Sequence, residues 1–110
     1  MADLSYVWEK FSTAIYSLAG GSSFQDRVLS AYMSFHPIRL EDFNQQPELQ
    51  ADYKEIMDRL SAKPETFPGE GRVPSTVRQM SDNEAVEVMT LIIDFCFSVA
   101  RQRIEDARHH

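Results

Sequence analysis

Residues 81–108 read SDNEAVEVMTLIIDFCFSVARQRIEDAR, and this stretch decides the fold. Ser81 and Glu84 stand at capping-box spacing, which indicates the start of a helix. Polar side chains then recur within roughly 80° of one another at 100° per residue, at Glu87, Thr90, Asp94, Ser98, Arg101 and Glu105. The apolar arc, which includes Val86 and Phe97, covers roughly 200°, about twice the stripe of an ordinary surface helix. We therefore expect a helix that is covered on two sides and forms the centre of an all-α bundle.

The same stretch also carries a strand signal. Many of its residues are β-branched, and residues 94–99 alternate between polar and apolar side chains. We favour the helix because no other segment offers a strand to pair with, and because the sequence that follows is rich in helix formers.

Three amphipathic segments precede this helix. Their apolar residues recur at steps of three and four, which predicts helices over residues 4–18, 24–36 and 47–62. Gly20 and Gly21 separate the first two helices so tightly that an antiparallel hairpin is expected. The second helix should end before Pro37, and the third should begin at Pro47. Three apolar side chains are expected to fix the connection between them to the core, namely Ile38, Leu40 and Phe43.

The remaining segment is rich in proline and glycine. Residues 63–74 hold three of the five prolines and two of the four glycines, so we expect one long loop there, followed by a short turn at residues 75–80. The fold class is therefore an all-α, single-domain bundle of four main helices over residues 1–110, with a charged tail at 101–110. We assign no function to His109 and His110.

Composition limits the classes of function. The chain has 110 residues, 43% of them hydrophobic and 25% charged, which is typical of one globular domain. Its formal net charge of -6 argues against direct binding to nucleic acid. Glu87 and Asp94 interrupt the longest apolar stretch, so we expect no membrane span. The single cysteine, Cys96, predicts a reducing, cytoplasmic location.

No group of residues indicates catalysis, a metal or a cofactor. His36 is the only histidine away from the C-terminus, and its place before a proline is typical of a structural residue at a helix end. Cys96 lies in the apolar arc and is expected to be a buried, inert thiol. Glu48, Asp52 and Glu55 have no histidine in their set, so a metal site is not expected. We therefore expect a protein that is not an enzyme.

Charge is distributed unevenly along the chain. Residues 41–58 hold six acids and one base, whereas residues 59–81 carry a small net positive charge. Glu48, Asp52 and Glu55 should form an acidic face beside the core stripe of the third helix. The sequence thus suggests an inhibitor, immunity-type protein or accessory subunit that binds a larger basic protein. A face that serves only solubility, or one that imitates nucleic acid phosphates, remains an alternative.

Two further sites follow from the sequence. Arg72 and Arg78 flank Ser75 and Thr76 in a way that suits one anionic group, so a small ligand-binding or catalytic domain is the alternative function.

The last helix should also be about 40 Å long and project from the domain, because it rises 1.5 Å per residue. Packing on the chain's own core should stop near Ala100, and Phe97, Ile104 and Ala107 are then candidates for contact with a second copy or another protein. A homodimer is accordingly one expected partner state, and fraying of the helix end is the alternative.

Overall fold

The computed structural model describes residues 4–108, which form five α-helices and one 3-10 turn. These elements are α1 (Leu4–Leu18), α2 (Phe24–Phe35), η1 (Leu40–Phe43), α3 (Pro47–Leu60), α4 (Arg72–Arg78) and α5 (Asp82–Arg108). The expected all-α architecture is confirmed, and residues 81–108 form a helix rather than a strand. His109 and His110 lie outside the described residues.

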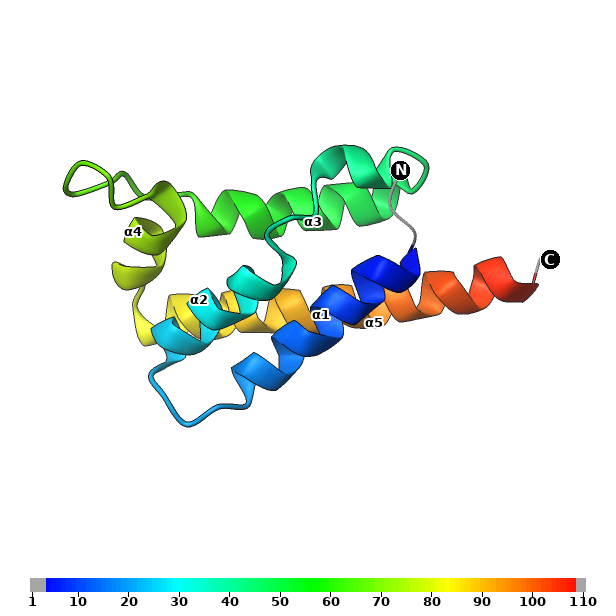
Figure 1. Cartoon of the computed structure of the whole chain (residues 1–110), viewed down its shortest axis with the longest axis horizontal. Helices are drawn as coiled ribbons and strands as arrows, with labels where there is room; N and C mark the ends of the chain where they lie inside the picture. The colour runs from blue at the N-terminus through cyan, green and yellow to red at the C-terminus, as the bar shows by residue number, and fades with distance from the viewer. Residues whose placement is uncertain (1–3, 109–110) are drawn as a thin grey trace.

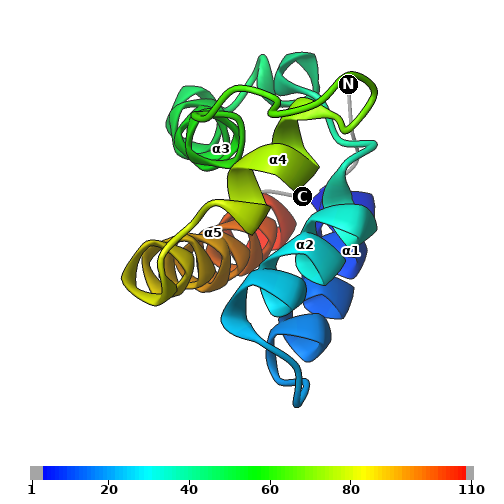
Figure 2. The ribbon, with the colours of Figure 1, turned by 90° about the vertical axis from the view of Figure 1, so that its left-hand side faces the viewer.

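The helices surround α5 on three sides. α1 and α2 form the expected antiparallel hairpin on one flank of α5, α3 runs antiparallel to α5 on another, and α4 closes one end (Figures 1 and 2). The molecule measures 49 × 28 × 19 Å, and the C-terminal end of α5 projects along its longest axis (Figure 1). Among the described residues, no helix is long and apolar enough to cross a bilayer.

Five aromatic rings, one from each of five elements, form the centre of the core. All are at most 2% exposed, and they are Phe11 of α1, Phe35 of α2, Phe43 of η1, Tyr53 of α3 and Phe95 of α5. Phe11 stacks on Phe35 with ring centroids 4.5 Å apart and lies 4.8 Å from Phe95. The ring cluster joins elements that are distant in sequence.

The connection between α2 and α3 is fixed to this core as expected. Ile38 and Phe43 are buried, and Leu40 is partly buried against them. The hydroxyl of Tyr53 donates a hydrogen bond of 2.6 Å to the Ile38 carbonyl. This bond joins α3 to the segment that precedes η1.

Capping residues set where two helices begin. The Ser81 hydroxyl accepts from the Glu84 amide at 3.1 Å, and the Glu84 carboxylate accepts from the Ser81 amide at 3.0 Å. Ser23 caps α2 by accepting from the Asp26 amide at 3.1 Å. Both caps supply acceptors for amides that have no partner within the first helical turn.

The expected turn at residues 75–80 is wrong, because a short helix, α4, already begins at Arg72. The Pro/Gly-rich loop therefore ends at residue 71 rather than 74. Pro74 fits inside the first turn of α4, where a backbone N–H has no helical partner to lose. Gly71 precedes the helix with a φ of 92°, a conformation that glycine adopts without steric cost. The third helix ends at Leu60, slightly earlier than expected.

The apolar arc of α5 is covered over only part of its width. Its buried side chains are Ala85, Val88, Ile92, Phe95, Cys96 and Val99. Val86 was expected within the covered arc but is 43% exposed, and Phe97, a candidate for contact with a second copy, is 57% exposed. Burial stops at Val99, so the end of the helix projects as expected from the length of the segment.

Candidate functional site

The acidic face lies on α3 beside its buried stripe. α3 buries Leu49, Tyr53, Ile56 and Leu60 against the bundle. Glu48, Asp52 and Glu55 are spaced at i, i+4 and i+7, so they share the neighbouring face and are all exposed. The structure therefore brings the three predicted acids together in one row.

Two of these acids meet a third carboxylate that comes from α5. Asp52 and Glu55 line a cavity of about 240 Å³ together with Asp94, and Leu91 and Phe95 supply its apolar lining. Phe95 is 2% exposed and forms part of the core beneath this cavity. The cavity thus combines negative charge with apolar surface.

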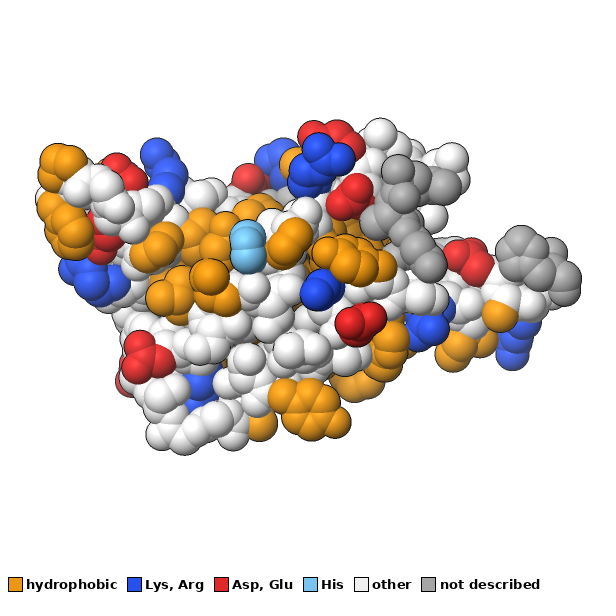
Figure 3. Space-filling model, viewed as in Figure 1, with side chains coloured by type: hydrophobic (Ala, Val, Ile, Leu, Met, Phe, Trp, Pro, Cys, Tyr) orange, Lys and Arg blue, Asp and Glu red, His pale blue; other side chains and the backbone are white. Residues whose placement is uncertain are grey.

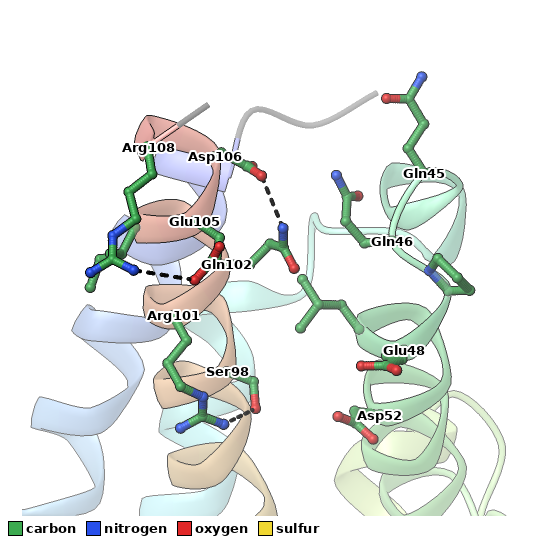
Figure 4. A pocket seen from close by; sticks show the side chains of 13 residues that line it. Gln45, Gln46, Glu48, Asp52, Ser98, Arg101, Gln102, Glu105, Asp106 and Arg108 are labelled. Atoms are coloured by element: carbon green, nitrogen blue, oxygen red, sulfur yellow. Dashed lines mark hydrogen bonds and ion pairs between the residues drawn. The ribbon is translucent and has the colours of Figure 1, made fainter. Parts of the chain in front are cut away.

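An open groove continues from this cavity towards the projecting end of α5. Figure 4 shows Glu48 and Asp52 on the side of α3 that faces α5, with Gln102 of α5 opposite. Arg101 and Arg108 belong to the same region; the Arg108 side chain points away from α3, and the Arg101 side chain runs along α5 and donates to the Ser98 hydroxyl at 3.1 Å (Figure 4). Neither arginine forms an ion pair with Glu48 or Asp52.

Ion pairs compensate only one end of the acidic row. The Arg59 guanidinium lies 3.0 Å from the Glu87 carboxylate and 3.9 Å from the Glu55 carboxylate, so it links α3 to α5 beside the cavity. Within residues 4–108, no cation pairs with Glu48, Asp52 or Asp94. Carboxylates that share a site without a counterion repel one another, and a bound cation removes that repulsion.

The two hydroxyls of the predicted anion site form hydrogen bonds with the backbone of the preceding loop. The Ser75 hydroxyl donates to the Pro64 carbonyl at 2.8 Å, and the Thr76 hydroxyl donates to the Lys63 carbonyl at 3.0 Å. The Lys63 amide also donates to Thr76 at 3.0 Å. Both hydroxyl residues are at most 1% exposed, so they attach the loop to α4 from within.

The two arginines of that predicted site have separate partners. Arg78 Nε donates to the Glu70 carboxylate at 2.7 Å, and Arg78 also contacts Thr66. This guanidinium lowers the pKa of Glu70 to about 2. Arg72 Nε donates to the Ser61 carbonyl at 2.7 Å. The four residues therefore do not surround one open position, because Glu70 occupies the place of an anion at Arg78.

Of the three predicted self-association residues, two line a hollow beside α1 and the third lies outside it. Ile104 and Ala107 line a shallow hollow with Trp8 of α1, where the Arg103 guanidinium lies 5.7 Å from the centre of the Trp8 ring. Ile104 is 58% exposed, and Phe97 is exposed outside this hollow. Hydrophobic side chains are also visible at the loop end of the molecule and along the projecting end of α5 (Figure 3).

Asp94 also lines the acidic cavity, although the sequence did not predict it as part of this site. Its signal is the narrow polar row of α5, which also holds Ser98 and Arg101. Only the packing of α3 beside α5 shows that this row faces Asp52 and Glu55. No group of three or more histidine, cysteine or acidic residues in the described chain is placed to hold a metal ion.

The groove between α3 and α5 has to be interpreted from its own residues. Its row of acids and its apolar lining are the features that bear on function. Comparison with known proteins finds no matching family model, no similar curated protein and no similar solved structure.

Proposed function

We propose that this protein is a non-catalytic interaction module that binds a basic segment of a larger protein in the groove between α3 and α5. The observation that carries the proposal is the cavity where Asp52, Glu55 and Asp94 lie over Leu91 and Phe95. A lysine or arginine fits this chemistry because its charged end pairs with carboxylates while its methylene stem packs on apolar surface.

The charge of the protein favours the same kind of partner. The net charge of -6 arises mostly from residues 41–58, which hold six acids and one base, and Glu48 extends the row of acids beyond the cavity. The electrostatic attraction of these acids accelerates the encounter with a basic partner, and it weakens as salt is added. An inhibitor, an immunity-type protein or an accessory subunit has this character. An imitation of nucleic acid phosphates is a special case, in which DNA competes with the protein for the same partner.

Capture from cell lysate tests this proposal. The variant Asp52→Lys/Glu55→Lys should lose the captured basic protein, because it reverses two of the three cavity charges. The control Glu9→Lys/Asp26→Lys changes the net charge equally, on α1 and α2, and should retain it. Equal capture by both variants would show that the acidic row of α3 does not bind the partner.

The alternative function is anion binding by a small ligand-binding or catalytic domain at α4. Arg78 already binds a carboxylate, that of Glu70, so its geometry suits an anionic group. An external anion has to displace Glu70 and then recruit Arg72. A thermal-shift screen with phosphate and carboxylate compounds tests this, since a bound ligand raises the unfolding midpoint. If no anion raises it, the alternative fails.

We also propose a cytoplasmic location. Cys96 is the only cysteine and is buried, so the fold uses no disulfide and needs no oxidising compartment. Fractionation of the source cells tests this assignment, and recovery of the protein outside the cytoplasm would contradict it.

A further inference from the structure

α5 carries a second apolar face beside the one that it buries, and Met89 and Ile93 on this face pack partly against the core. Seven side chains lie within roughly 80° of one another on this face at 100° per residue, and we call them the outer stripe: Val86, Met89, Ile93, Phe97, Ala100, Ile104 and Ala107. Its C-terminal part borders α1, because Ala100, Ile104 and Ala107 line the shallow hollow that also contains Trp8. Val86, Phe97 and Ile104 are 43%, 57% and 58% exposed. An apolar row of this length on a surface helix marks an interaction site.

Part of the outer stripe is symmetric in sequence about position 95. Val86 and Ile104 lie at equal distances from position 95, and so do Ile93 and Phe97. A second α5 that runs antiparallel about this position therefore matches Val86 with the partner's Ile104 and Ile93 with the partner's Phe97. Met89, Ala100 and Ala107 fall opposite polar or charged side chains. Isologous pairing of this kind is the contact that a two-fold dimer makes.

Opposite charges stand at the two ends of the stripe. Asp82 and Arg108 are also at equal distances from position 95, so antiparallel pairing places Asp82 beside the partner's Arg108. Asp82 accepts a hydrogen bond of 3.0 Å from the Gln25 side chain, which is neutral. Arg108 is highly exposed and lies 3.7 Å from Glu105. A parallel pair would instead bring like charges together at both ends.

We propose that two copies of this chain associate through antiparallel α5 helices, with Phe97 packed against the partner's Ile93 and Asp82 paired with the partner's Arg108. The large exposed ring of Phe97 is covered near the two-fold axis, and Val86 and Ile104 are covered towards the ends. The proposed contact meets the open groove at the projecting end of α5, where Ile104 and Arg108 belong to both, but it shares no residue with the cavity of Asp52, Glu55 and Asp94.

Sedimentation velocity between micromolar and millimolar concentration tests the pairing. The wild-type chain should be a dimer in this range. Phe97→Glu should raise the dissociation constant on the order of a hundredfold, because each dimer buries two such rings. The control Tyr16→Glu alters a side chain that is 81% exposed on α1 and should leave the dimer unchanged. A wild-type chain that stays monomeric at every concentration would overturn the proposal.

Reversed charges test the register. Asp82→Arg and Arg108→Asp should each raise the dissociation constant roughly tenfold, since each places like charges at both ends of the dimer. A mixture of the two single variants should form a mixed dimer, because every end then holds opposite charges. Circular dichroism of each variant verifies that the helices persist. Mixed dimers no tighter than either variant alone would exclude this antiparallel register.

Discussion

Replacement of Tyr53 by phenylalanine isolates the buried hydrogen bond between α3 and the segment that precedes η1. Tyr53 is 1% exposed, and its hydroxyl donates to the Ile38 carbonyl at 2.6 Å. The variant Tyr53→Phe keeps the ring in contact with Phe43 and Phe95, whose centroids lie 5.3 and 5.8 Å away. It leaves one buried carbonyl without a donor, which costs about 1–3 kcal/mol.

Urea denaturation followed by far-UV circular dichroism measures this cost. We expect Tyr53→Phe to lower the free energy of unfolding by about 1–2 kcal/mol, and Tyr53→Ala by about 3–5 kcal/mol because it also removes the ring. The control Tyr16→Phe changes an exposed hydroxyl and should stay within about 0.5 kcal/mol of the wild type. A Tyr53→Phe variant as stable as the wild type would refute the hydrogen bond as a support of α3.

The same residue also predicts a loss of stability in alkali. Burial, followed by the nearby Tyr32 and Asp42, raises the pKa of Tyr53 above its ordinary value of about 10. Because the folded pKa exceeds the unfolded one, the contribution of Tyr53 is complete below pH ~10 and is lost as the pH rises through the folded pKa. The stability difference between wild type and Tyr53→Phe should therefore shrink above pH ~10. A difference that stays constant there would contradict this.

Three further predictions concern α4, its loop and the buried thiol. Glu70→Gln should lower the thermal midpoint at neutral pH; because Arg78 holds the pKa of Glu70 at about 2, the difference from wild type should persist above the ordinary carboxyl pKa and vanish as the pH falls towards 2. Thr76→Val should cost about 1–3 kcal/mol in urea titrations, since the Lys63 amide and carbonyl both lose their partner. Burial raises the pKa of the Cys96 thiol, so a thiol reagent should label it only at the rate of global unfolding, and rapid labelling of the native protein would disprove this.

Periodicity predicted most of the fold because most of the fold is local amphipathic helix. The hairpin of α1 and α2, the start of α3 at Pro47 and the cap at Ser81 follow from signals within a few residues. α4 was missed because Pro74 was interpreted as a loop residue. Its actual place in a first helical turn depends on Gly71 and on loop contacts that are distant in sequence.

The candidate site was predicted only in part, for a related reason. Spacing along α3 was enough to place Glu48, Asp52 and Glu55 in one row. The contribution of Asp94 depends on which side of α5 packs beside α3, and a single helix does not encode that choice. Val86 illustrates the same limit, since the width of the apolar arc alone did not show that the other helices leave this side chain exposed.

A titration of the isotopically labelled protein with a short arginine-rich peptide tests the central claim most directly. Amide chemical shifts report which residues the basic side chains approach. We expect the changes in chemical shift to concentrate on Asp52, Glu55 and Asp94 and to weaken as salt is added. Shifts that spread evenly over the surface, or that concentrate on α4, would contradict a basic-segment site between α3 and α5.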